Sequence, residues 1–404
     1  MEFRNLTPFS VMNYKMLDTD DKEHHVIAMK VKYSLVHFSD DIYQAKIETN
    51  ESLCIQDQYL SAPLCSGVRS ESDLSPFKPY CDVIIIGSAI APDSKPVTQF
   101  PVSLTVTENN IRLIDKTINI FGKRCLKKIN ELWELQSPEL FITLPLGYEY
   151  AFGGECKIYA DEHYNKIDEH YLLSENNRRF HPENPLPPIA HDYHPFNPAG
   201  KGYIQNWYIK AKDIDYIEIH RIEDIKYPFD INEYINVITA DKDLNAPCFM
   251  PAGFGVITRS WQPRLSKAGT YDDTWINNRH PYLPKDFDFN YWNSAPADQQ
   301  ISYPGNDITI RVTNMTHSGS LQVTLPGHRA FLLARLENGP ILPVALNLDT
   351  IILDTDTLSL LLTFRQKLST DLPLRVLEAR FETNLNAPLF SVSLPDKNTG
   401  DKHG

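Results

Sequence analysis

The chain has few cysteines, and they lie far apart. The six, at positions 54, 65, 81, 125, 156 and 248, include no Cys-x-x-Cys pair. Zinc ribbons and thioredoxin-like redox sites need that spacing, so both are excluded. We expect free, mostly buried thiols, which are typical of proteins from a reducing compartment.

Long hydrophobic runs are also missing. The longest aliphatic run is VIII at 83–86, far shorter than the roughly 20 residues that cross a bilayer as a helix. The opening segment, MEFRNLTPFSVMNYK, lacks the basic and apolar regions of a secretory signal. We therefore expect a cytoplasmic protein without membrane insertion.

Basic residues are in the minority. The chain has 39 Lys and Arg against 52 Asp and Glu, a net charge of −13, and no basic run exceeds two or three residues. Nucleic-acid binding requires clustered Lys and Arg, so this partner class is excluded. An acidic surface still permits a basic protein partner.

Familiar catalytic and cofactor motifs are absent. The chain contains no Gly-x-Ser-x-Gly elbow and no Gly-Lys-Ser/Thr phosphate loop. AGKGYI at 199–204 and AGFGVI at 252–257 each lack the third glycine and the following helix of a dinucleotide site. The sequence thus predicts no catalytic residue, cofactor or metal.

Alternating apolar residues are the main pattern present. They mark strands at 26–35, 308–312, 321–325 and 358–364, and DVIIIGSAI at 82–90 indicates a buried strand whose Gly87 suggests a bulge or a close backbone approach. Helical spacing is confined to about 123–136. With 29 prolines among 404 residues, we predict a mainly β protein: antiparallel sandwich or barrel-like sheets, long Pro-rich loops and one or two short helices.

We predict two structural regions and a tail. Residues 1–304 form a larger β-rich domain with a long loop insertion at about 155–300, and residues 305–396 form a C-terminal antiparallel region. Residues 397–404 are expected to be a disordered tail. Within the insertion, HPENPLPPIAHDYHPFNP at 181–198 is too rich in Pro and Asn for a regular element.

The segment GTYDDTWINNRHPYLPKDFDF at 269–289 is dense in acidic and aromatic residues. Asp286-x-Asp288-x-Asn290 begins like a calcium loop, but Tyr291 and Ala297 stand where that loop needs Gly and Glu. Paired on a strand, Asp286 and Asp288 would be about 6.5–7 Å apart, a separation that glycosidase carboxylates can have.

The interpretation that we favour for this segment is a polar lattice. In it, Tyr271, Trp275 and Phe287 pack inward, and Asp272, Asp286 and Asp288 pair with Arg264 and Arg279 or cap turns. If such a pair is buried, Asp286→Ala is expected to reduce soluble yield before it reduces any binding.

Five of the thirteen histidines lie within 163–194, at positions 163, 170, 181, 191 and 194. On a helix His163 and His170 would be about 10 Å apart, too far to share one metal. We therefore expect a polar surface insertion, with adventitious zinc or nickel binding as the alternative.

Several spaced motifs resemble one known family. They are NLTPF (5–9), SDLSPFKPYCDVIIIGSAIAP (72–92), PLGYEYAFGG (145–154), NPAGKGY (197–203), PAGFGVITRSWQPRLSKAGTYDDTW (251–275) and LPKDFDFNYWNSAPADQQ (283–300). The chain resembles the bacterial type VI secretion adaptor-chaperone family, long catalogued as a domain of unknown function. The matching residues, expected to be structural or partner-binding, are Lys78, Pro79, Asp82, Gly87, Glu149, Phe152, Gly153, Gly154, Asn197, Pro198, Gly202, Trp261, Arg264, Gly269, Tyr271, Asp272, Trp275, Asp286, Phe287 and Asp298.

The resemblance implies a non-enzymatic cytosolic protein of a Gram-negative bacterium. It would bind a toxin effector encoded nearby and assist its loading on the spike, with a PAAR-domain protein or VgrG as further partners. FGKRCL (121–126) and TFRQ (363–366) depart from the family pattern, which leaves the partner-specific surface open. The alternatives are a carboxylate- or metal-dependent hydrolase of cell-wall or carbohydrate substrates, and a structural component of the spike.

Overall fold

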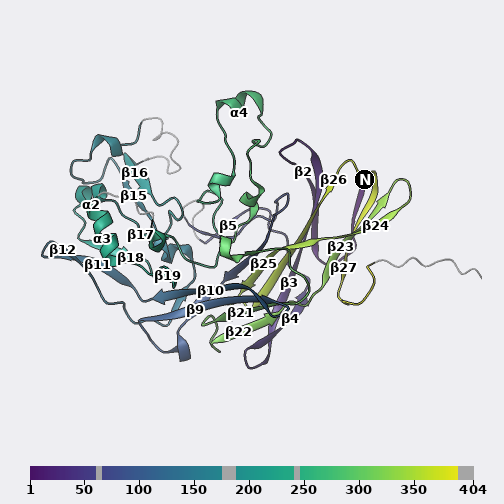
Figure 1. Cartoon of the computed structure of the whole chain (residues 1–404), viewed down its shortest axis with the longest axis horizontal. Coiled ribbons are helices and arrows are strands. Elements are labelled where there is room, and N and C mark those ends of the chain that lie inside the picture. The colour runs from purple at the N-terminus through teal and green to yellow at the C-terminus, as the bar shows by residue number, and fades with distance from the viewer. Residues whose placement is uncertain (61–65, 175–187, 241–245, 390–404) are drawn as a thin grey trace, which may run out of the picture.

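The computed structural model describes residues 1–60, 66–174, 188–240 and 246–389. A twelve-stranded sheet curls into a half-barrel through the middle of the molecule (Figure 1). In spatial order its strands are β19 (Ile222–Asp224), β10 (Ile111–Phe121), β9 (Gln99–Glu108), β21 (Ile308–Thr313), β22 (Ser320–Thr324), β4 (Ile42–Glu48), β3 (Glu23–Ser39), β26 (Ser359–Ser369), β25 (Asn347–Asp354), β7 (Cys81–Ile86) and β20 (Gln300–Ile301), and β2 (Ser10–Leu17) pairs with β3.

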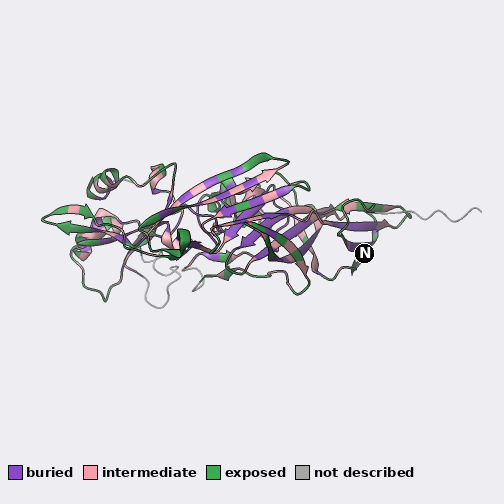
Figure 2. Ribbon diagram, turned by 90° about the horizontal axis from the view of Figure 1, so that it is seen from below, coloured by how far each residue is buried: buried purple, intermediate pink, exposed green. Residues whose placement is uncertain are grey.

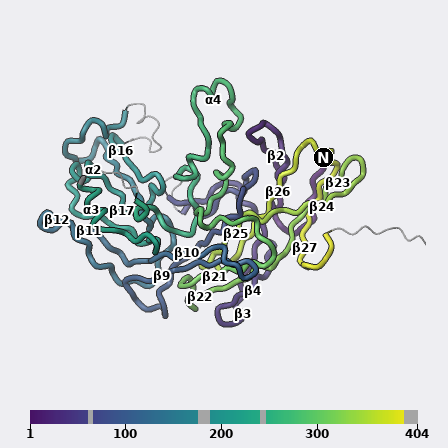
Figure 3. The backbone as a smooth tube through the Cα atoms, in the orientation of Figure 1, coloured from purple at the N-terminus to yellow at the C-terminus, as the bar shows by residue number. Residues whose placement is uncertain are grey.

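Two further sheets flank this half-barrel. At one end lie β1 (Glu2–Asn5), β27 (Leu374–Glu382), β23 (Arg329–Leu336) and β24 (Ile341–Ala345), in which the N-terminal strand pairs in parallel with a C-terminal one (Figure 3). At the other end lie β12 (Leu132–Leu135), β11 (Arg124–Ile129) and β18 (Tyr216–Ile219). The two-stranded pairs are β13 (Thr143–Pro145) with β8 (Ser88–Ile90), β14 (Phe152–Gly153) with β17 (Lys201–Gly202), β15 (Glu155–Ile158) with β16 (Ala190–Tyr193), and β5 (Gln58–Tyr59) with β6 (Val68–Ser70).

Helices are few in the described residues. They are α2 (Asn206–Lys212), α3 (Ile231–Ala240) and α4 (Asp273–Asn278), with short 3₁₀ turns such as η2 (Tyr148–Tyr150), η6 (Phe289–Trp292) and η7 (Ala297–Gln299). None of these helices is long and apolar enough to cross a membrane. The prediction of a mainly β protein is confirmed.

β3 explains why the half-barrel is buried on both faces. Ile27, Met29 and Val31 point into the main hydrophobic core, and all three are 0% exposed. On the opposite face Lys30 is also buried, because its ammonium bonds Asp73 in the segment that crosses that face. Figure 2 shows the resulting buried layer through the centre of the molecule. One face of the sheet, its front, therefore packs on the main hydrophobic core. The opposite face, its back, is covered by polar segments such as the one that contains Asp73.

The prediction of a helix at 123–136 is wrong, because these residues form the β11–β12 hairpin. Its turn residues, Asn130 and Glu131, have φ of 47° and 67°, as in the type I′ turns that match the twist of a hairpin. Leu126 enters a second hydrophobic core beside α2 and α3. The burial of Leu126 against these helices and the two-residue turn favour the hairpin, although the leucines have helical spacing.

The stretch 181–198 was predicted to lack a regular element, and this is wrong for its second half. Ala190–Tyr193 form β16, which pairs with β15 and buries Ala190 in the second core. Residues 181–187 lie outside the described residues, as do residues 397–404, the predicted tail. Strands from both sides of residue 305 share the large sheet, where β9 pairs with β21; the division of the chain at 305 stays a prediction.

Candidate functional site

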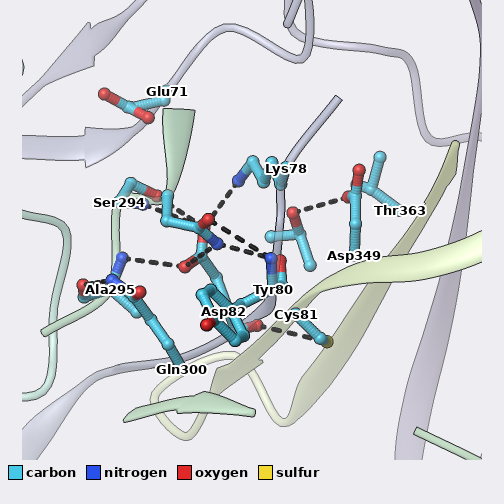
Figure 4. A network of polar contacts seen from close by, with 12 residues as sticks. Glu71, Lys78, Tyr80, Cys81, Asp82, Ser294, Ala295, Gln300, Asp349 and Thr363 are labelled. Carbon is cyan, nitrogen blue, oxygen red and sulfur yellow. Dashed lines mark hydrogen bonds and ion pairs between the residues drawn. The ribbon is translucent and has the colours of Figure 1, made fainter. Parts of the chain in front are cut away.

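Asp82 is the centre of a buried polar network on the back of the large sheet. Its carboxylate, 0% exposed, accepts hydrogen bonds from Lys78 Nζ at 2.8 Å, Asn293 Nδ2 at 3.0 Å, and the backbone N–H groups of Ser294 at 2.9 Å and Ala295 at 3.2 Å (Figure 4). Burial alone would raise the pKa of Asp82, but the Lys78 ammonium and the hydrogen bonds hold it below its usual value. Asp82 thus joins the motif at 72–92 to the motif at 283–300.

Arg264 makes a second junction between distant motifs. Its guanidinium, 2% exposed, forms an ion pair with Glu71 and donates to the carbonyl oxygens of Ile257 at 2.6 Å and Tyr291 at 2.9 Å. Arg259 also contacts Glu71, at 3.2 Å. A planar guanidinium with several fixed donors suits such a junction, because it satisfies two backbone carbonyls and one carboxylate together.

Two more buried cations complete the network. Arg365 on β26 pairs with Asp349 and donates to the carbonyl of Asp73 at 2.8 Å, and burial raises the pKa of Asp349. Lys116 on β10 bonds Asp298 and Gln299, both at 2.9 Å, and burial lowers the pKa of its ammonium. These contacts tie η7 and the crossing segment to the strands.

A separate junction surrounds Phe152, which belongs to the second hydrophobic core. Its ring lies between His194 and His220, each with its ring centre 5.3 Å away in an edge-to-face arrangement. Asn197 Nδ2 donates to the carbonyls of Tyr148 at 2.7 Å and Phe152 at 2.9 Å. Burial lowers the pKa of both histidines to about 4, so both are neutral at pH 7.

The glycines of PLGYEYAFGG and NPAGKGY belong to the same junction. Gly153 has φ of +149°, and a Cβ there would lie 2.1 Å from the carbonyl oxygen of Asn197, so only glycine fits. Gly154 donates to that same oxygen, while Gly202 pairs with Gly153 in β14–β17 and accepts from the buried Tyr234 hydroxyl. Pro198 follows Asn197 and is half-buried. The contacts of this junction hold the segments 145–154 and 197–203 together.

The segment 269–289 forms an arm that projects from the body of the protein and carries α4 (Figure 1). We call this segment the arm. Asp272 accepts from Trp275 N at 2.8 Å and caps α4, and the Trp275 indole donates to the carbonyl of Tyr282 at 2.9 Å. At the base, Asp286 accepts from Thr270 Oγ1 at 2.7 Å. The arm is therefore held in one shape by its own polar groups.

Arg279 fastens this arm to the turn between β2 and β3. Its guanidinium makes two parallel bonds to Asp21, at 2.7 and 2.9 Å, and a third to the carbonyl of Thr19 at 3.0 Å. Lys285 donates to the same carbonyl at 2.6 Å. A two-pronged bond of this kind fixes orientation as well as distance, so it joins the arm to the turn in a defined orientation.

Large apolar side chains on the arm face solvent. Tyr271 is 51% exposed, Ile276 57% and Tyr282 44%. An open groove of about 370 Å³ lies between the arm and β2. It is lined by Lys15, Met16, Leu17, Glu23, Pro281, Tyr282, Leu283 and Trp292. We call these three exposed side chains and this groove the arm surface.

The arm differs in two respects from the predicted lattice. Phe287 is buried as predicted, but Trp275 is only partly buried and Tyr271 is exposed because the arm stands clear of the core. The predicted pairing of the aspartates with Arg264 and Arg279 is wrong, since these arginines pair with Glu71 and Asp21. Asp272 and Asp288 instead cap α4 and η6, which is the other predicted option. Asp286 bonds Thr270, 16 residues away, which neither option includes.

These bonds change what Asp286 and Asp288 can do. Asp288 accepts from Asn290 N at 2.9 Å and caps η6. Asp286 is exposed, and its bonds to Thr270 lower its pKa. Because Asp286 belongs to no buried pair, we now expect Asp286→Ala to have little effect on soluble yield, contrary to the expectation from sequence.

The remaining predicted residues have structural contacts. Trp261 is buried against Tyr148, with ring centres 6.0 Å apart, and Pro79 is half-buried between Lys78 and the strand. Gly87 separates β7 from β8 in close contact with the Thr355 side chain, as its predicted close approach requires. Gly269 turns the chain into the arm with φ of +83°.

Glu149 and Gly87 line a small pocket of about 160 Å³ at the end of β7. The pocket lies between the β7–β8 bend, η2 and the segment Gly255–Val256. Three of the family-like motifs thus contribute to it, a convergence that sequence spacing does not reveal.

The described histidines form no metal centre. Within residues 1–60, 66–174, 188–240 and 246–389, no group of three His, Cys, Asp or Glu side chains could hold a metal ion. His170 contacts Asp168 and His191 contacts Glu155, while His194 is buried against Phe152; His181 lies outside these ranges. The five cysteines within them are free.

Sequence reasoning missed the partners of the buried network. Glu71, Asp73, Asp349 and Arg365 are as central to it as Asp82, and none belongs to the predicted set. Charged residues inside otherwise apolar strands, such as Arg365 in LLLTFRQKL, are a usable signal, because an unpaired buried charge is very costly.

Comparison with known proteins gives a family but no described activity. A family model described as an uncharacterized protein conserved in bacteria (DUF2169) matches residues 20–365. No curated protein and no solved structure matches the chain. The matched range includes the polar network, the Phe152 junction and the arm.

Proposed function

The chain belongs to this family of uncharacterized proteins conserved in bacteria, and from that premise we propose that it is a non-enzymatic adaptor-chaperone of type VI secretion. It binds and stabilises a toxin effector and assists its loading on the PAAR/VgrG spike. The resemblance of the spaced motifs to the adaptor-chaperone family supports this role.

The observation that carries the proposal is the arm surface. Tyr271, Ile276 and Tyr282 are exposed on a projection that is tied by its own hydrogen bonds and by the Arg279–Asp21 pair. Exposed aromatic and aliphatic side chains on a preorganised support are typical of protein interfaces, because little entropy is lost when they are covered. A chaperone for an insoluble client needs such a surface.

Charge supports a basic client. The net charge of −13 attracts a basic protein over a range that salt shortens. Association is therefore expected to be faster at low ionic strength. The groove beside the arm carries the Lys15–Glu23 ion pair, with 2.7 Å between Nζ and Oε2, so attraction comes from the whole surface rather than from this groove.

The hydrolase alternative finds no specific support in the arm. Asp288 caps η6 and accepts from Asn290, while Asp286 accepts from Thr270 across the base of the arm. Asp286 is exposed rather than enclosed in a substrate cleft. A general acid needs a raised pKa, whereas the pKa of Asp286 is lowered. We therefore favour binding over catalysis.

Co-expression with the toxin effector encoded nearby tests the proposal. The effector is expected to become soluble and to co-purify with the chain, while an effector from another locus serves as the matched control. An effector that is equally soluble alone, and that does not co-purify, would contradict the adaptor function.

A further inference from the structure

The pocket beside η2 contains a carboxylate oxygen that has no hydrogen-bond partner among the described residues. Glu149 lies in this 3₁₀ turn, and its carboxylate folds back over Gly147, where a Cβ would be 2.1 Å from Oε2 and 2.3 Å from Oε1. Both residues line the pocket. The missing side chain of Gly147 therefore provides the space that the carboxylate occupies.

Glu149 Oε2 is buried and has no hydrogen-bond partner in the part of the chain that the structure describes. Among the buried polar atoms in that condition it is the sole carboxylate oxygen. Buried carboxylates elsewhere, such as Asp82 and Glu71, are fully engaged by cations and N–H groups. Glu149 is half-buried as a residue, but this enclosed oxygen has lost contact with water without gaining a donor, and a cation that enters the pocket would supply one.

The other charged groups of the pocket already have partners. Arg69 pairs with Asp354, with 3.2 Å between nitrogen and oxygen. Asp356 accepts from the N–H of Ser88 at 2.9 Å and from its hydroxyl at 3.1 Å. Glu149 is therefore the lining group that remains available to a ligand.

We propose that this pocket binds the cationic end of an arginine or lysine side chain, with Glu149 as its counter-ion. A volume of about 160 Å³ is smaller than the roughly 300–1,000 Å³ of pockets for whole small molecules, and it suits one long side chain. Leu146, Val256 and Leu60 line the wall, where the aliphatic stem of such a side chain packs. The head group then meets the carboxylate.

The protein that supplies this side chain is the basic effector, and this part of the inference rests on the proposed function. The pocket and the arm surface would then contact the same client, the pocket by charge and the arm by apolar burial. Arginine is expected to bind more tightly than lysine, because its planar guanidinium can pair with both carboxylate oxygens.

The test uses the purified chain alone with N-acetyl-arginine amide as the probe and N-acetyl-citrulline amide as its neutral, equally sized control. Calorimetric titration at low salt is expected to show arginine amide binding about tenfold or more tightly than citrulline amide. Glu149→Gln is expected to abolish this difference, whereas Glu134→Gln, an exposed carboxylate on β12, should leave it unchanged. Arg69→Gln removes a nearby positive charge and is expected to strengthen arginine amide binding.

Equal binding of the two probes, or tight arginine amide binding to a folded Glu149→Gln variant, would overturn the pocket assignment. Thermal melts of each variant confirm that the fold is intact. This assay needs no effector, so its failure is distinct from failure of the adaptor function. Loss of co-purification with an intact arginine response would refute only the adaptor function.

Discussion

Replacing Asp82 by Asn tests whether the polar network carries the stability of the fold. The change keeps the size of the side chain but removes its charge. Lys78, 6% exposed, would then lose the carboxylate that its ammonium bonds at 2.8 Å. Breaking a buried ion pair by removing one partner costs about 3–5 kcal/mol. The N–H groups of Ser294 and Ala295 would also lose a charged acceptor.

The assay is urea denaturation at pH 7, followed by circular dichroism. The free energy of unfolding is expected to fall by about 3–5 kcal/mol in Asp82→Asn, and hardly at all in Asp286→Asn, the exposed control on the arm. Adding Lys78→Met to Asp82→Asn removes the unpaired cation, so the double variant is expected to recover part of the loss.

Two outcomes would refute the reasoning. One is an Asp82→Asn variant within about 1 kcal/mol of the wild type, because that is the range of an exposed pair. The other is an equal loss in Asp286→Asn, which would mean that the arm, and not the buried network, limits stability. A double variant less stable than the single one would show that Lys78 has other partners.

Two further predictions concern the Phe152 junction. Burial holds the pKa of His194 and His220 at about 4 against 6.5 in the unfolded chain, so the unfolded state binds more protons between these values. The free energy of unfolding is expected to fall as pH drops from 6.5 to 4, by up to about 3 kcal/mol per histidine; an unchanged pH slope in a folded variant with both replaced by Gln would contradict this. Gly153→Ala is expected to cost about 2 kcal/mol or more, since φ is +149° and the Cβ would meet a backbone oxygen. Gly319→Ala, with φ of +88° and nothing within 4 Å, should cost only about 1 kcal/mol by thermal melting.

The strands could be predicted from sequence, because alternation reports directly which side chains face the core. β3, β21 and β26 lie where the pattern indicates. The pattern failed at 123–136, where Leu126 follows helical spacing yet enters the core from a hairpin. Here a turn of two residues and burial against α2 and α3 decide the conformation, and neither is visible in a local window.

The buried network shows a different limit of sequence reasoning. Arg264 was expected to pair with aspartates close to it in the chain, but its partner is Glu71, 193 residues away. Charge and spacing reveal that a partner is needed, while the fold decides which one it is. The local alternative, that Asp272 and Asp288 cap turns, depends only on neighbouring N–H groups and could be foreseen.

The exposure of Tyr271 could not be foreseen for the same reason. Aromatic residues beside aspartates and prolines suit either a packed lattice or a projecting arm. The position of the arm depends on Arg279 reaching Asp21, 258 residues away. A contact between residues so far apart in the chain is not visible in the local pattern.

The central claim is that the arm surface binds the effector, and the most direct measurement compares two matched isoleucine variants. Ile276→Asp places a charge on the arm, whereas Ile111→Asp changes a similarly exposed isoleucine at the start of β10; the two side chains are 57% and 66% exposed. Titration of the co-expressed effector is expected to give a Kd at least about tenfold higher for Ile276→Asp and unchanged for Ile111→Asp. Equal affinity of a folded Ile276→Asp variant and the wild type would contradict the account.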